Sequence, residues 1–348
     1  GITEFDVEQG FYPERVVVAI PNSFTAQNIT DLQQAVKKAG QFKEIRFLRE
    51  AEALLVHLSQ HPWELVKEKA LDGKNVLIFD MGGGTINATL ASYAKVREGA
   101  DTSDRITIRG RLGYAMGGDS IDYYLLEYIF ENEHVVDTFP NLKKYSPFSK
   151  KNTDIQKLGI KEDVEVLKRT ILRHYDEDGE FLFEPEQINK LARSDVFSEV
   201  NYSEFYDVFS SKMLKESKEF SELFTAIRAI IDDMIFFAKK QKIEEFDYVM
   251  FAGRGVQFPW VQETVEQQLQ HNGFNFKPIK LPGDKGKTAV AHGAAEYGIR
   301  GASIQIKNDI VSTHIGVKQT LDAEEVRYLP LIPMGKNFDY RSNGMPYI

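Results

Sequence analysis

The chain has 348 residues, of which 42% are hydrophobic, a formal net charge of -9 and no cysteine. This length exceeds that of one ordinary domain and predicts two or three compact units. The negative charge argues against a nucleic-acid partner, which requires a basic face, and no apolar run reaches the roughly 18 residues of a membrane span. The lack of cysteine excludes disulfides and thiolate chemistry and fits a reducing compartment, so we expect a cytoplasmic protein without a membrane partner.

The first part of the chain alternates strands and helices. Arg15–Ile20 (RVVVAI) is a continuous apolar run typical of a buried strand, and a helical pattern that ends at Gly40 follows it. A second short strand, Ile45–Leu48, leads into a helix over Glu50–Leu58. Glu50 therefore lies at a strand-to-helix junction. It is either a catalytic carboxylate or a helix-start residue favoured by the macrodipole.

The most informative stretch is Asn75–Thr89 (NVLIFDMGGGTINAT), which predicts a strand, a glycine-rich hairpin and a second strand. The hairpin glycines are Gly82, Gly83 and Gly84. Glycines let backbone N–H groups converge on an anion, so this turn is a candidate phosphate site. Asp80 ends the strand, where it is placed to hold Mg²⁺ through water, and Thr85 offers a hydroxyl to a phosphate oxygen. A plain hairpin turn is the alternative, and no Gly-Lys-Ser/Thr of a Walker-type loop follows.

A second glycine pair, Gly117 and Gly118, comes after a strand through Ile106–Arg109. It precedes a helix predicted over Ser120–Phe130, with Asp119 as the expected N-cap. A helix N-terminus behind glycines is a second candidate anion site. Helix capping alone explains the same residues.

Residues 121–245 are predicted to form a mostly helical insertion. We expect a polar loop over Glu131–Gln156, a helix over Lys161–His174 and a strongly amphipathic helix over Phe220–Lys240. One face of the Lys161–His174 helix carries Glu165, Lys168 and Arg169. From the residues alone, that face is expected to be a solvated stripe.

A strand, a glycine turn and a helix occur again after the insertion. Asp247–Ala252 (DYVMFA) predicts a buried strand, and a helix is predicted over Pro259–Gln270. The turn between them consists of Gly253, Arg254 and Gly255. This arrangement seats a ligand at the end of a sheet. Strands without helices are predicted over Ile304–Val317 and Val326–Ile332, so we expect a new module from about residue 303.

In this order, the segments resemble the nucleotide-binding domain of the heat-shock 70 (DnaK-like) chaperone family, within the actin-like ATPase superfamily. The family's strand and proline switch are similar to RVVVAIPNSF, its second phosphate loop to NVLIFDMGGGT, and its loop opening the outer lobe to AMGGDSID. Its adenosine-clasping helix is similar to EVLKRT, its adenosine loop to DYVMFAGRGVQFPWVQ, and its closing helix to AVAHGAA. The start of its peptide-binding β-module is similar to DIVSTHIGV and YLPLIPMGKNF, so the resemblance runs from Arg15 to Phe338.

The resemblance implies an α/β chain with the actin-like ATPase (ribonuclease H-like) fold, a truncated first lobe and a short β extension at the C-terminus. Residues 1–74 would be the remainder of the first lobe, 75–120 and 246–302 the second-lobe core, 121–245 the helical outer subdomain, and 303–348 the start of a β substrate-binding-like module. The family's first phosphate loop, Asp-x-Gly-Thr, and its catalytic lysine match nothing here. We therefore expect a fragment.

The resemblance also implies a site for ATP or ADP with Mg²⁺. Glu50 would orient the attacking water, Asp80 would serve the magnesium shell, and Thr85 with the glycines of its loop would hold phosphates. Gly117 and Gly118 would lie against the phosphates from the other lobe. The residues implied to clasp or accommodate the adenosine are Glu165, Lys168, Arg169, Gly253 and Gly255. Pro21 would be the switch that couples the site to the rest of the domain.

Several residues depart from the family pattern. Asn87 stands where the family usually has a second loop aspartate that helps hold cations. Arg254 replaces a glycine, where its side chain would crowd the base or stack on it. Ile29 takes the place of the arginine that relays the proline switch, and Leu172 that of a small hydroxyl residue. The linker before Asp309 is IQIKN, where the family has an apolar run.

The resemblance therefore implies the ATP-binding and ATP-hydrolysing domain of a heat-shock 70-like chaperone, with in-line attack of water on the γ-phosphate. Its partners would be nucleotide, unfolded polypeptide clients and co-chaperones. Two alternatives stay open. One is a catalytically weak or inactive nucleotide-binding scaffold, which Asn87 and Ile29 favour. The other is another actin-superfamily enzyme, such as a sugar kinase or a filament former.

Overall fold

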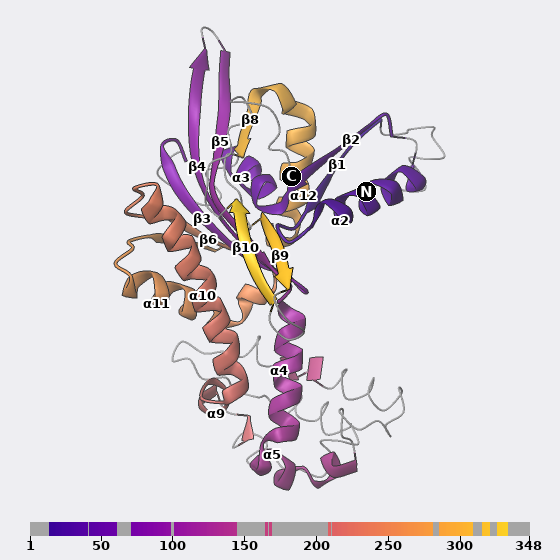
Figure 1. Ribbon diagram of the computed structural model, residues 1–348, viewed down its shortest axis with the longest axis vertical. Coiled ribbons are helices and arrows are strands. Elements are labelled where there is room, and N and C mark those ends of the chain that lie inside the picture. The colour runs from indigo at the N-terminus through magenta and orange to yellow at the C-terminus, as the bar shows by residue number, and fades with distance from the viewer. Residues whose placement is uncertain are drawn as a thin grey trace.

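The computed structural model describes residues 14–40, 42–60, 71–98, 101–144, 164–165, 167–168, 208–209, 211–280, 285–308, 315–320 and 326–332. At its centre is a six-stranded sheet in the order β7-β6-β3-β4-β5-β8 (Figure 1). The strands are β3 (Lys74–Met81), β4 (Ile86–Glu98), β5 (Asp101–Tyr114), β6 (Tyr248–Ala252), β7 (Lys277–Lys280) and β8 (Ile304–Asn308). β4 is antiparallel to β3 and β5, whereas β6 runs parallel to β3 and β7, and β8 runs parallel to β5. The expected α/β class is confirmed.

Alternate residues of β3 enter two separate hydrophobic cores. Leu77 and Phe79 pack in one core with residues of α10 (Lys218–Lys240) and α11 (Pro259–His271). Val76 and Ile78 pack in the other core with residues of α3 (Glu50–Gln60) and α12 (Lys285–Arg300). Figure 1 shows these two helix pairs on opposite sides of the sheet. A strand buried on both faces must be apolar throughout, which explains the continuous hydrophobic run before Asp80.

A second, two-stranded sheet is formed by β1 (Arg15–Ile20) and β2 (Glu44–Arg49), which run parallel. They are connected through α2 (Ala26–Ala39), whose N-cap Thr25 accepts a hydrogen bond at 3.2 Å from the backbone N–H of Asn28. β2 continues directly into α3, so Glu50 is the first residue of that helix. The strand, helix, strand, helix order predicted for this part of the chain is confirmed.

The outer helices are α4 (Gly118–Glu131), α5 (Glu133–Thr138), a 3-10 helix over Pro140–Lys144 and α9 (Ser211–Lys215). The loop expected from Glu131 is therefore wrong for its first part. The Asn132 side chain caps α5 by accepting from the N–H groups of His134 at 3.0 Å and Val135 at 3.4 Å, and Val135 is buried. Of the helix expected over Lys161–His174, residues 164–165 and 167–168 are described and are helical.

The C-terminal strands divide between two sheets. β8 follows a 3-10 helix over Gly301–Ser303 and is an edge strand of the main sheet, because it pairs with β5. β9 (Ile315–Thr320) and β10 (Val326–Ile332) form an antiparallel sheet of their own. Strands are thus confirmed in the described parts of the ranges Ile304–Val317 and Val326–Ile332, while the division into lobes and a β-module stays a prediction. Among the described helices, none has the length and hydropathy needed to cross a bilayer.

Candidate functional site

A cavity of about 870 Å³ lies where the carboxyl ends of β3 and β6 meet β1, the start of α3 and α12. The predicted site residues in its lining are Glu50, Asp80, Gly82, Gly83, Thr85, Gly253 and Arg254. The other lining residues, all apolar, are Val17, Val18, Ala19, Ala252, Val290, Ala291 and Ala294. The volume is that of a small-molecule site, and ligands commonly bind at the carboxyl ends of parallel strands. The structure therefore brings the two predicted loops to one cavity.

Asp80 and Glu50 contribute two carboxyl groups to the cavity. Asp80 is only 7% exposed, because β4 and β6 flank it in the sheet. Burial, and then the charge of nearby Glu50, raise the pKa of Asp80 to about 7. Burial also raises the pKa of Glu50. Burial therefore favours the protonated form of each acid. A bound divalent cation would favour the charged forms, because it would compensate their negative charge.

The carboxyl groups fit a magnesium ion that is held together with a phosphorylated ligand. Among the described residues, no group of three or more His, Cys, Asp or Glu side chains forms a metal cage. Mg²⁺ does not need such a cage, since it commonly takes one or two carboxylates together with water and substrate phosphates. Asp80, with Glu50 and the Thr85 hydroxyl in the same lining, offers oxygen donors of this kind.

The glycine turn after Asp80 is held by the start of α4. The N–H of Gly118 donates to the carbonyl of Gly82 at 2.8 Å, and the N–H of Asp119 donates to that of Gly83 at 2.7 Å. The C=O and N–H of a trans peptide point in opposite directions, so the N–H groups of Gly83 and Gly84 point away from α4. Within the described part of the chain, neither N–H has a hydrogen-bond partner. Two neighbouring unpaired N–H groups suit an anion.

The fold does not require glycine in this turn. None of the three glycines has a positive φ. A Cβ atom at Gly82 or Gly83 would meet no described atom closer than 3.8 Å, and one at Gly84 would meet none within 4 Å. In the protein without a ligand, a Cβ atom would therefore fit at each of these positions. The close approach of a ligand to the backbone is a physical reason for glycine at these positions.

Packing does require glycine at Gly117, Gly253 and Gly255, whereas a Cβ at Gly118 would meet no described atom closer than 3.5 Å. A Cβ at Gly117 would lie 2.5 Å from the carbonyl oxygen of Gly83. Gly253 has a φ of 81°, and its Cβ would lie 2.5 Å from Asp80 Oδ1. A Cβ at Gly255 would lie 2.5 Å from Met81 Cγ. These glycines let the two loops and α4 approach each other closely.

The start of α4 differs from the sequence prediction. Its N-cap is Gly117, and Asp119 instead lies in the first turn, because the first N–H groups of the helix bond to carbonyls of the Asp80 loop. Gly117 and Gly118 are not among the residues that line the cavity. The N–H of Gly118 is already occupied by Gly82. The two residues thus position the turn, and their contact with a ligand stays a prediction.

Of the charged residues predicted to clasp adenosine, the two that the structure describes, Glu165 and Lys168, do not line the cavity. Lys168 Nζ donates to Asp122 Oδ2 at 2.7 Å and to the carbonyl of Gly118 at 3.3 Å. Burial raises the pKa of Asp122, although the Lys168 charge opposes this. Lys168 therefore ties its own segment to the first turn of α4. Glu165 lies on the same helical segment, and Arg169 is outside the described residues.

Arg254 is the cationic residue in the described lining of the cavity. Its backbone follows Gly253 in a right-handed helical conformation, and its carbonyl accepts from Gln257 N at 3.1 Å. Its side chain is exposed and, within the described part of the chain, the guanidinium makes no ion pair. A positive charge is therefore available to an anionic ligand in this cavity.

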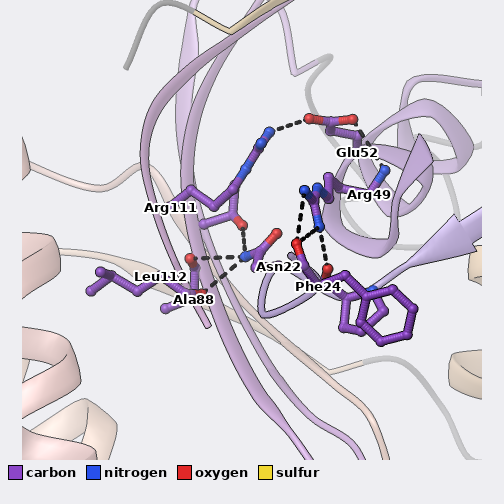
Figure 2. A network of polar contacts seen from close by, with 9 residues as sticks. Asn22, Phe24, Arg49, Glu52, Ala88, Arg111 and Leu112 are labelled. Carbon is purple, nitrogen blue, oxygen red and sulfur yellow. Dashed lines mark hydrogen bonds and ion pairs between the residues drawn. The ribbon is translucent and has the colours of Figure 1, made fainter. Parts of the chain in front are cut away.

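Sequence reasoning missed a polar network at the turn after β1. Asn22 Nδ2 donates to Thr89 Oγ1 at 2.9 Å and to the carbonyls of Leu112 at 3.0 Å and Ala88 at 3.3 Å (Figure 2). These bonds fix the turn against β4 and β5. The Asn that follows Pro21 was a signal for a turn, but no local pattern indicates partners 66 to 90 residues away.

The same network includes a buried ion pair. Arg111 donates to Glu52 Oε1, and the backbone N–H of Arg49 donates to Glu52 Oε2 at 3.2 Å (Figure 2). The Arg49 side chain in turn donates to the carbonyls of Pro21 and, at 3.5 Å, Phe24. The predicted switch residue Pro21 is therefore linked to α3 by hydrogen bonds of Arg49. Its function as a switch stays a prediction.

The sequence matches no protein-family model. The family suggested by the motifs therefore stays a proposal, and the cavity and the residues around it carry the argument.

Proposed function

We propose that this chain is the nucleotide-binding, ATP-hydrolysing domain of a heat-shock 70-like chaperone with the actin-like ATPase fold. The observation that carries the proposal is that the Asp80 loop, Glu50 and the Gly253 turn line one cavity. A buried carboxylate for magnesium, a turn with unpaired N–H groups and a second carboxylate are the parts that phosphoryl transfer to water needs.

Each part has a role in the proposed reaction. Asp80 would hold Mg²⁺, which when bound supplies positive charge to the phosphates. The N–H groups of Gly83 and Gly84 would donate to phosphate oxygens, and Thr85 would offer its hydroxyl. Glu50 would accept a hydrogen bond from the attacking water and orient it. Positioning and electrostatic stabilisation account for most of the catalysis in this class of reaction.

A second candidate is a nucleotide-binding scaffold with little or no turnover. It is favoured by the contact of Asn87 Nδ2 with Glu50 Oε2 at 3.4 Å, because an amide there occupies one oxygen of the carboxylate proposed to orient water. Partners of the chaperone type, unfolded polypeptide clients and co-chaperones, belong to the first proposal. The lack of cysteine is consistent with a cytoplasmic location in both.

A calorimetric titration of the chain with Mg·ADP and Mg·ATP tests the proposal. Saturable binding that is abolished by EDTA and by Asp80→Ala is expected. Asp31→Ala, which removes an exposed carboxylate on α2, is the control and should bind like wild type. Equal affinity in Asp80→Ala and wild type would overturn the assignment of the loop. Phosphate release from Mg·ATP then separates the two candidates, because only the ATPase predicts multiple turnovers.

A further inference from the structure

Both polar atoms of the Asn87 side-chain amide have hydrogen-bond partners within the protein. It lies on β4 opposite Asp80 and is only 3% exposed. Its Oδ1 accepts from the backbone N–H of Asn22 at 2.9 Å. Its Nδ2 lies 3.4 Å from both Glu50 Oε2 and Thr85 Oγ1. Since a backbone N–H can only donate, the contact with Asn22 fixes the amide with its NH₂ group toward these two residues.

We propose that Asn87 is a positioning residue of the nucleotide site, whose amide orients the Glu50 carboxylate and whose neutrality limits the cavity to one divalent cation. This inference rests on the proposed function. It assigns to Asn87 a role in the site that its hydrogen bonds to Asn22, Glu50 and Thr85 support.

The neighbours of Asn87 favour a neutral side chain at this position. Glu50 and Asp80 already bring two carboxyl groups into one cavity, and Asp80 is only 7% exposed. A third carboxylate in contact with Glu50 would require a proton or a further cation, because like charges at this distance disfavour each other. An amide of the same shape instead donates a hydrogen bond to the charged form of Glu50. The site thereby keeps Glu50 oriented without an additional ion.

A measurement without nucleotide tests the inference independently of the proposed function. Mn²⁺ binding to the chain is followed by electron paramagnetic resonance in wild type, Asn87→Asp and Asn28→Asp. Asn87→Asp retains the acceptor for the Asn22 N–H, so it leaves the structural bond in place. It should bind Mn²⁺ about tenfold more tightly than wild type, since affinity for hard cations rises with the number of carboxylates. Asn28→Asp adds the same charge on exposed α2 and should bind like wild type.

The double variant Asn87→Asp/Glu50→Gln assigns the gain to the proposed pair. If the two residues act as a pair, Asn87→Asp should raise Mn²⁺ affinity far less than tenfold when it is added to Glu50→Gln, so the double variant is compared with Glu50→Gln alone. Thermal unfolding establishes that each variant folds. Unchanged Mn²⁺ affinity in folded Asn87→Asp, or a tenfold gain of the double variant over Glu50→Gln alone, would overturn the inference.

Mg·ADP titrations of the same variants measure the number of cations linked to nucleotide binding. Wild-type affinity should follow the first power of free Mg²⁺ concentration. Asn87→Asp should show a steeper dependence, with weak binding at low Mg²⁺ that is restored at high Mg²⁺. A folding defect would not be restored by the cation. If wild type binds no Mg·ADP while the Mn²⁺ result is as expected, the proposed nucleotide function fails and the placement of Asn87 against Glu50 stands.

Discussion

The backbone N–H of Gly118 donates to the carbonyl of Gly82 at 2.8 Å, which fastens the first residue of α4 to the Asp80 loop. This bond, and the neighbouring one from Asp119 to Gly83, use the carbonyl side of the turn. The N–H side is consequently directed away from the helix. The geometry of the turn thus depends on a helix that begins more than 30 residues later in the chain.

Gly117→Ala should disturb this arrangement. The new methyl group would lie 2.5 Å from the carbonyl oxygen of Gly83 and 2.6 Å from the backbone N of Thr85, so the turn must move. We expect Mg·ADP affinity to fall by about tenfold or more, as small displacements in a preorganised site are costly. The measurement is a calorimetric titration of folded protein. Wild-type affinity would contradict the proposed positioning role of α4.

The turn glycines and Gly253 should behave in opposite ways. Gly84→Ala meets no described atom within 4 Å, so the free energy of unfolding should change by about 0.5 kcal/mol or less, while Mg·ADP affinity should fall. Gly253→Ala forces a side chain onto a φ of 81° and against Asp80, so the free energy of unfolding should fall by about 2 kcal/mol. Urea denaturation and nucleotide titration measure both quantities. A Gly84→Ala variant with unaltered affinity would argue against a ligand at this turn.

Asp80→Asn should stabilise the protein without bound cation at neutral and alkaline pH. Folding raises the pKa of this carboxyl from 3.8 to about 7, so between these values the native state binds more protons than the unfolded state. Stability therefore falls as the pH rises through this window, by a total on the order of 4 kcal/mol from this group. Asparagine does not ionise, so Asp80→Asn does not suffer this loss of stability. Urea denaturation in EDTA at pH 5 and pH 8 measures the free energy of unfolding of both proteins.

In that experiment, the stability gain of Asp80→Asn over wild type should be larger at pH 8 than at pH 5. Glu50, whose pKa burial also raises, should leave a weaker dependence of the same sign in the variant. Asp31→Asn, on the exposed side of α2, is the matched control and should keep the wild-type pH dependence. If the variant is less stable than wild type at pH 8, burial of the charged Asp80 carboxylate does not destabilise the native state.

Glu52→Gln should destabilise the protein strongly. The Glu52 side chain is 5% exposed and accepts from Arg111, whose side chain is 15% exposed, and removing one charge leaves the other buried. We expect a loss of about 3 kcal/mol in the free energy of unfolding. The control is Lys43→Ala, which removes the exposed ion pair with Glu14 and should cost about 0.5 kcal/mol or less. Equal losses in the two variants would contradict the structural role of the buried pair.

Local patterns predicted the elements around the site well. The apolar run before Asp80 indicated a buried strand, and the two glycine turns were located by glycines at the ends of apolar runs, where glycine favours a turn. The strand-to-helix junction at Glu50 was predicted because a short apolar strand pattern is followed directly by a helical pattern of apolar residues. Each of these features depends on neighbours along the chain.

The contacts that organise the site were not predictable in the same way. Asp119 is not the N-cap of α4, because the helix N–H groups bond to Gly82 and Gly83. Lys168 pairs with Asp122, a partner 46 residues away, and does not line the cavity. β8 joins β5 across about 200 residues, which no composition change reveals. Contacts between residues far apart in the sequence determine these features. Local sequence patterns indicate only the periodicity of helices and strands and the positions of turns.

The most direct test of the central claim is a crystal structure of the chain with Mn·ADP, in which anomalous scattering locates the metal. The account predicts one Mn²⁺ peak beside Asp80, with the phosphates of ADP against the Gly82–Gly84 turn. A metal and nucleotide bound elsewhere, for example in a cavity between α10 and α11, would contradict it. A crystal grown at saturating Mn·ADP with no metal beside Asp80 would contradict it equally.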